Sequence, residues 1–408
     1  MSISEVLPLV ILLAGAFLMF GGNELGRRAK LLEAIGSGAI LCLVAVGLGL
    51  FVASGRAWWA GDAGGDRLLT YARLVGLTGM LFLAGATFRL QNIRRTRIAG
   101  FAALSALLVI ITTLLFSSLA NLPVGTAAFI GASFVSSSLW FPAAFQTSHR
   151  NDQTVAVNLS GATAFTATAM FWAYWAEALS AIPAARSTAT TYAIVTLYEL
   201  VKLAVVFGFA YFISTRFLAR AHGRISQVRT NVGFILIAIL VFALISFATG
   251  IIGSMAWAFV AGALWRRTEV GDEFGKRAKP IASALLVSLV FLSLLLQVHG
   301  RELSFSLGVI VAAAVAIALK LLSAWFMLAR DSNENRESLF VIAAMAFPGE
   351  MAILFLSVAV TRFVIDGPIF FFVVAYAFLS AFLIPALLFV ANNHPISAGK
   401  QLRETIYQ

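Results

Sequence analysis

Long apolar stretches alternate with short polar stretches along the whole chain, and this pattern predicts a bundle of membrane-spanning helices. An α-helix needs about 20 predominantly apolar residues to cross the hydrocarbon layer of a bilayer. About thirteen stretches meet or approach this length, and the predicted spans are 5–21, 33–53, 69–90, 98–117, 123–146, 154–178, 189–214, 230–250, 253–265, 280–298, 304–328, 338–361 and 367–391. The expected fold class is therefore an all-α integral membrane protein.

Two of these spans are interrupted near their middle. In Leu122–Phe145 a group of serines that includes Ser136–Ser138 lies at mid-span, and in Ser338–Val360 the sequence Phe347-Pro348-Gly349-Glu350 breaks the apolar run. A proline removes a backbone donor and disrupts the preceding helical turn. Where a helix unwinds, its backbone groups lose their partners and can bind a solute or an ion. Paired interruptions therefore indicate the binding site of a secondary transporter.

The two interrupted spans are seven spans apart in the chain, and so they cross the membrane in opposite directions. Opposite crossing is what an inverted repeat requires, with the helix predicted at 189–214 connecting the two halves. The order of the helices and the position of the breaks thus predict inverted repeats with two crossed, broken helices.

The composition agrees with a single polytopic membrane domain over residues 1–408. Of the 408 residues, 61% are hydrophobic and 12% are charged, and the mean hydropathy is +0.94. A soluble domain is about half apolar and about one quarter charged. The single cysteine, Cys42, provides neither a disulfide framework nor a metal cluster. The sequence contains no phosphate-binding loop, nucleophile elbow or zinc motif, so we expect no cofactor, no metal and no enzymatic activity.

The net charge of +11 has a topological explanation that needs no nucleic-acid partner. Basic residues concentrate in alternate loops, for example Arg94, Arg95 and Arg97 after the third predicted span, whereas Arg186 stands alone in the loop before the seventh. Loops rich in lysine and arginine face the cytoplasm. This rule predicts an N-terminus outside and a cytoplasmic C-terminus, which agrees with an odd number of spans.

Five sequence features occur in an order and spacing typical of one transporter superfamily. They are LVGLTGMLFLAGATFRLQNIRRTR in Leu74–Arg97, the serines Ser136–Ser138, GSMAWAFVAGALW in Gly253–Trp265, Lys320 within an apolar helix, and Phe347-Pro348-Gly349-Glu350. Together they resemble the monovalent cation/proton antiporter superfamily, in particular its bacterial thirteen-helix sodium/proton exchangers and potassium-efflux proteins. The resemblance covers nearly the whole chain.

This resemblance implies a division of the membrane domain into two parts that move against each other. The core, or transport, part would comprise approximately 98–178 and 304–391, and the scaffold, or dimerisation, part approximately 5–90 and 230–298, joined by the connector helix 189–214. The resemblance also implies a homodimer, in contact with lipid, in the inner (plasma) membrane of a bacterial cell.

The chain departs from the superfamily at one place. Antiporters of this type carry acidic residues in the span after the first break, where protons and cations compete. The corresponding segment here, Asn158–Thr168, reads NLSGATAFTAT and contains neither aspartate nor glutamate, and the nearest carboxylate, Asp152, belongs to the preceding loop. In that segment, Asn158, Ser160 and Thr163 match the aspartate positions best, and with Ser136–Ser138 they form a hydroxyl-rich candidate site for a cation or a polar solute.

Lys320 and Glu350 are the ionisable candidates within the core. A charged side chain in a membrane span costs about 2.5–3.5 kcal/mol on insertion scales, which makes such residues functional candidates. Lys320 either holds the crossing helices together by donating to freed carbonyls, or carries the proton or contacts the substrate. Glu350 either caps the half-helix that follows it or provides the main acidic ligand of a cation.

Glu199 and Lys202 lie on one face of the connector helix, three residues apart. Residues at this spacing are neighbours on a helix surface and can neutralise each other. A structural ion pair is the favoured interpretation, and an ion pathway is the alternative.

These expectations favour a secondary active transporter that exchanges sodium or potassium for protons by alternating access. One alternative keeps the fold but assigns an anion or an organic solute, because Lys320 and two half-helix N-termini would make the site electropositive. Another alternative is a non-transporting sensor or assembly subunit that has lost the coupling residues.

Overall fold

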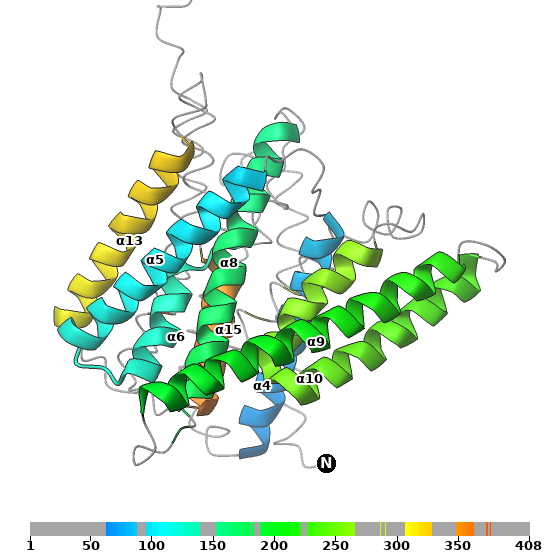
Figure 1. The fold of residues 1–408 in the computed structure, drawn as a ribbon, viewed down its shortest axis with the longest axis horizontal. Helices are drawn as coiled ribbons and strands as arrows, with labels where there is room; N and C mark the ends of the chain where they lie inside the picture. The colour runs from blue at the N-terminus through cyan, green and yellow to red at the C-terminus, as the bar shows by residue number, and fades with distance from the viewer. Residues whose placement is uncertain are drawn as a thin grey trace, which may run out of the picture.

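A computed structural model describes residues 63–87, 95–138, 152–180, 182, 188–221, 227–265, 286, 290, 307–328, 348–362, 373 and 376. Every regular element in these ranges is an α-helix (Figure 1). The helices are α4 (Ala63–Thr87), α5 (Arg95–Leu119), α6 (Val124–Val135), α8 (Asp152–Ser180), α9 (Ala189–Ala221), α10 (Gln227–Trp265), α13 (Leu307–Leu328) and α15 (Gly349–Arg362). The all-helical prediction is confirmed for this part of the chain, whereas the predicted spans at 5–21 and 33–53 lie outside it.

The helices form two groups (Figure 1). The first group contains α5, α6, α8, α13 and α15, with α6 in contact with all the others. The second group contains α4, α9 and α10, in which α10 packs against both of its neighbours. Helix α8 also contacts α9 and α10, so it lies at the boundary between the two groups.

Four helices in the described ranges are long and apolar enough to cross a membrane. These four segments are Ala99–Leu119, Ala189–Arg216, Leu236–Trp265 and Leu307–Trp325. The predicted spans at 98–117, 189–214 and 304–328 correspond closely to three of them. Helix α8 begins at Asp152, so this residue starts the helix instead of lying in the loop expected from the sequence.

A tight connection places α6 against α5. Asn121 follows α5 with a φ of 53°, a left-handed conformation that asparagine tolerates at the end of a helix. Pro123 then caps α6, and its carbonyl accepts the first helical hydrogen bond from Ala127 at 2.9 Å. A Cβ atom added to Gly131 would lie 2.9 Å from Oγ1 of Thr112, so this glycine allows the two helices to pack closely.

Helices α4 and α10 cross at a reciprocal glycine contact. A Cβ atom on Gly85 would lie 1.9 Å from the carbonyl oxygen of Phe259, and one on Gly262 would lie 1.9 Å from the carbonyl oxygen of Phe82. Both sites belong to the same short pattern, FLAGA in α4 and FVAGA in α10. Only glycine permits such a close approach of two backbones, as in other packed membrane helices.

Helix α10 bends sharply at Gly250, and its two arms run in different directions (Figure 1). Gly250 has φ 70° and ψ −161°, a backbone conformation that is essentially restricted to glycine. The bend falls at the predicted boundary between the spans 230–250 and 253–265. The first arm lies along α9, while the second contributes to the crossing with α4.

Candidate functional site

The first interrupted span unwinds at the predicted serines. Helix α6 ends at Val135 after only 12 residues, and Ser136 has the extended angles φ −56° and ψ 150°. The hydroxyl of Ser133 donates to the carbonyl of Ile130 at 2.7 Å, and that of Ser136 donates to the carbonyl of Ser133 at 2.9 Å. Serine hydroxyls that bond their own backbone compete with helical hydrogen bonds. The hydrogen bonds from serine hydroxyls to the backbone therefore coincide with the end of α6.

The unwound residues Ser136–Ser138 are completely buried. Buried backbone groups must find partners, and those of Ser137 find one on α8. The hydroxyl of Thr166 accepts a hydrogen bond from the Ser137 amide at 3.2 Å and donates to the Ser137 carbonyl at 2.6 Å. One threonine side chain thus replaces both helical partners of Ser137.

Lys320 provides the partner for the adjacent carbonyl. This residue lies midway along α13, is 1% exposed, and donates from Nζ to the carbonyl oxygen of Ser136. Ala316 and Ala324, one turn away on either side, are also buried and leave room for α13 to approach the break. The structure therefore has the contact expected of a lysine that donates to freed carbonyls.

The second interrupted span is described from Pro348 onward. Helix α15 begins at Gly349, and the amide of Met351 donates to the carbonyl of Pro348 at 3.0 Å. Helix α15 packs against α6, so helices from the two spans predicted to be interrupted lie side by side. Glu350 belongs to the first turn of α15, and its side chain lies outside the described residues.

The remaining candidates of the hydroxyl-rich zone lie on α8. Asn158 and Ser160 are in the first part of this helix, where side chains are outside the described set, and Thr163 lines a cavity described below. Thr166, which contacts the break directly, was not singled out as a site residue by sequence reasoning. Its signal was its place in the same hydroxyl-rich segment, one turn beyond Thr163.

A cavity of about 510 Å³ adjoins the break on the side facing the second helix group. Its lining comes from α4, α8, α9 and α10 and is mostly apolar, with Met170, Phe207 and Met255 among the large side chains. Thr163, Thr166 and Tyr174 are the hydroxyl-bearing residues of the described lining. Because Thr166 lines the cavity and also bonds to Ser137, its side chain lies between the cavity and the unwound backbone.

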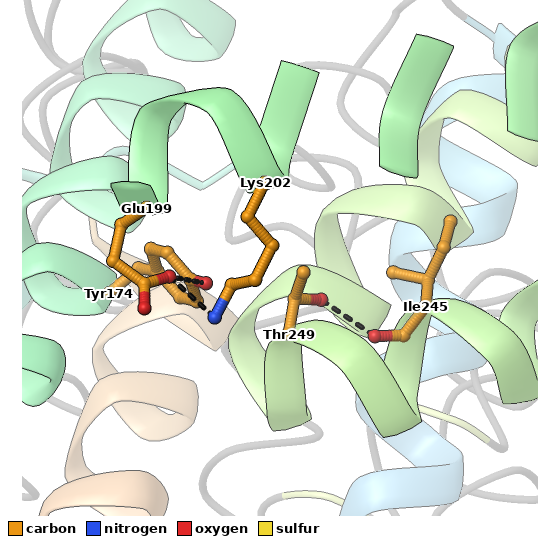
Figure 2. A network of polar contacts seen from close by, with 5 residues as sticks. All are labelled: Tyr174, Glu199, Lys202, Ile245 and Thr249. Atoms are coloured by element: carbon orange, nitrogen blue, oxygen red, sulfur yellow. Dashed lines mark hydrogen bonds and ion pairs between the residues drawn. The ribbon is translucent and has the colours of Figure 1, made fainter. Parts of the chain in front are cut away.

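Glu199 and Lys202 form an ion pair on α9, with 2.5 Å between Nζ and Oε2. Figure 2 shows that the phenol of Tyr174 on α8 joins them, and its hydroxyl donates to the same carboxylate oxygen. The favoured prediction of an intrahelical pair is thus correct in geometry. The structure adds a third member, Tyr174, from a neighbouring helix, and the spacing of residues along the chain does not predict this contact.

The buried break after α6, the buried Lys320 and the two helix groups agree with an integral membrane transporter of the sodium/proton antiporter fold. The sodium/hydrogen exchanger transmembrane family matches residues 9–391, and the chain therefore belongs to this family. The predicted superfamily and fold class are confirmed. Members of this family are transporters, not enzymes.

The fold is similar to that of the sodium proton antiporter MjNhaP1 from Methanocaldococcus jannaschii at pH 8, with a TM-score of 0.65. This similarity covers 94% of the present chain and 99% of the MjNhaP1 chain, at 13% sequence identity. No curated protein sequence matches the chain significantly.

Proposed function

We propose that this protein exchanges a monovalent cation, sodium or potassium, for protons by alternating access. The observation that carries this proposal is the unwound segment Ser136–Ser138, buried beside the intramembrane Lys320 and next to a cavity at the boundary of the two helix groups. Interrupted helices at the bilayer centre are the ion and substrate sites of secondary transporters. Membership of the sodium/hydrogen exchanger family also supports the exchange of a cation for protons.

The proposed ion site comprises Ser136, Ser137, Ser138, Asn158, Ser160, Thr163 and Glu350. Hydroxyl and backbone oxygens replace part of the hydration shell of a cation, and Glu350 supplies the negative charge. The proton is carried by Glu350 or by Lys320. Lys320 also stabilises the site, because its amine holds the carbonyl of Ser136 in place.

The proposed movement takes place between two parts of the molecule. The core part (98–178 and 304–391) corresponds to the group of α5, α6, α8, α13 and α15, and the scaffold part (5–90 and 230–298) includes α4 and α10. The cavity at their boundary supports a core that slides against the scaffold and exposes the break to each side in turn. We further propose a homodimer in the inner membrane of a bacterial cell, with the C-terminus in the cytoplasm.

Transport in membrane vesicles tests this function. A pH gradient is established, and its dissipation is followed after addition of sodium, potassium or an organic anion, for the wild type, Lys320→Ala and Glu350→Gln. We expect cation-dependent proton movement in the wild type and its loss in both variants. Asp152→Asn, at the start of α8, serves as the control and should retain activity.

Other outcomes identify the alternatives. Flux with organic anions alone would replace cation exchange by anion transport through an electropositive site. A lack of flux with every solute would indicate a sensor or assembly subunit.

A further inference from the structure

We propose that Glu199, Tyr174 and Tyr198 form a second site for a monovalent cation, which the ammonium group of Lys202 occupies in this structure. The inference rests on the proposed cation exchange but concerns a different place in the molecule, at the contact of α8 with α9.

The ammonium group of Lys202 has the surroundings of a bound cation. Its Nζ lies 2.5 Å from the Glu199 carboxylate, 5.5 Å from the ring centre of Tyr174 and 5.6 Å from that of Tyr198. A carboxylate supplies the compensating charge, and aromatic faces attract cations within about 6 Å of the ring centre. Thr249, also drawn in Figure 2, donates instead to the carbonyl of Ile245 on its own helix.

The cavity is lined by one residue that contacts this cluster, Tyr174, and by one that contacts the unwound segment after α6, Thr166. Thr163, Thr166, Met170 and Tyr174 line it from positions that follow one face of α8. Thr166 bonds to Ser137, while Tyr174 bonds to Glu199. Thr166 and Tyr174 are eight residues apart, which corresponds to about 12 Å along a helix. The mostly apolar lining thus includes two hydroxyls, about two turns apart, that bond to polar groups on neighbouring segments.

An ion that crosses an apolar cavity needs a polar group at its far end. In this protein the span after the first break has no carboxylate in Asn158–Thr168, whereas α9 carries one at Glu199. Glu199 follows the start of α9 by ten residues, about 15 Å of helix, which places it near the middle of a bilayer about 30 Å thick. Its position suits it to receive the ion.

Lys202 acts in this proposal as a tethered competitor of the transported cation. Its side chain is 26% exposed, against 13% for Glu199, so the lysine has more room to change conformation than the carboxylate. The site binds an external cation only during the fraction of time that Lys202 is displaced, and this fraction lowers the apparent affinity. If the ion pair were only structural, removing Lys202 would lower the stability of the protein and would not raise its affinity for the cation.

The test measures binding of sodium-22 and rubidium-86 to the purified full-length protein in detergent, in parallel with cation-driven proton transport in vesicles. Lys202→Met removes the competitor and should increase the apparent cation affinity about tenfold. Glu199→Gln should reduce the affinity, and the double variant Glu199→Gln/Lys202→Met should bind as weakly as Glu199→Gln. The double variant buries no unpaired charge, so it keeps the test valid if a single variant is unstable. Glu177→Gln, on α8 but outside the cavity lining, is the matched control.

A local optical signal complements the binding data. The indole of Trp175 donates to Thr196 at 2.7 Å, one turn before Glu199, and thereby reports on the α8–α9 contact. Cation addition should change the tryptophan emission of the wild type but not that of Trp175→Phe or Glu199→Gln. Unchanged cation affinity in both Lys202→Met and Glu199→Gln would overturn the proposal, even if the wild type transports normally. Absence of transport by the wild type would instead contradict the proposed function.

Discussion

Thr166 and Lys320 show how single side chains can replace the hydrogen bonds that a broken helix gives up. The carbonyls of Ser136 and Ser137 follow the end of α6, and each receives a donor from a different helix. A buried carbonyl or amide without a partner costs about 1–3 kcal/mol. The break is therefore stable because α8 and α13 complete it, and any ion that binds there must compete with or join these donors.

We predict that Thr166→Val lowers the stability of the protein by about 1 kcal/mol, because valine keeps the shape of threonine but loses both contacts with Ser137. Thr166→Ser retains the hydroxyl and should behave like the wild type. The thermal unfolding midpoint in detergent measures the effect. Thr168→Val is the control, because the hydroxyl of Thr168 donates to the carbonyl of Ala164 on its own helix, at 2.9 Å. Equal losses for Thr166→Val and Thr168→Val would contradict the bridging role.

At the scale of secondary-structure elements, glycines decide how the helices of the second group meet. Gly85 and Gly262 let α4 and α10 touch backbone to backbone, and Gly250 allows α10 to change direction between the predicted spans. The close contact at Gly85 and Gly262 requires the absence of a side chain. The bend at Gly250 requires its backbone conformation instead, because a Cβ atom added there would meet nothing within 4 Å.

Gly250→Ala should destabilise the protein by about 1–3 kcal/mol, the cost of holding a residue other than glycine in this conformation. Gly208 provides a matched control in α9, where an added Cβ atom also meets nothing within 4 Å but the backbone is helical. Gly208→Ala should stabilise the protein by about 0.5–1 kcal/mol, since alanine is the better helix former. Unfolding midpoints that move in the same direction for both variants would refute this distinction.

At the scale of the whole molecule, the two helix groups meet at a cavity that is lined by α4, α8, α9 and α10. Helix α8 contributes Thr166 to the break and Tyr174 to the cluster on α9, so it links the proposed core with the connector helix. Movement between the groups would change the shape of the cavity and the contacts at its two ends together. Which side of the membrane each end of the helices faces is a separate property of the whole molecule, set by its orientation in the bilayer.

The proposed orientation predicts a labelling pattern. In a Cys42→Ser background, Ser187→Cys lies in the loop expected outside, and Ser226→Cys lies in the arginine-rich loop expected in the cytoplasm. A membrane-impermeant maleimide applied to right-side-out vesicles should label the first variant, and should label the second only after the membrane is permeabilised. The reverse pattern would refute the orientation derived from the positive-inside rule.

Much of the architecture could be predicted from the sequence, because its determinants are local. Hydropathy predicted the spans at 98–117, 189–214 and 304–328, and the serines before Pro142 indicated where α6 unwinds. Lys320 was recognisable because a charged residue within an apolar span is rare. The predicted spans before residue 63 and the side chain of Glu350 lie outside the described residues, and for these the predictions stand untested.

Hydropathy and local backbone chemistry alone determined that this chain enters a membrane, and that its first interrupted helix breaks at Ser136–Ser138. Only the tertiary structure decided that Thr166 would complete the break, that Tyr174 would join Glu199 and Lys202, and that both Thr166 and Tyr174 would line one cavity. The physical reason is that these contacts join different helices, 29 residues apart for Thr166 and Ser137 and 25 for Tyr174 and Glu199. They depend on how each helix is rotated and packed, which a linear pattern does not specify.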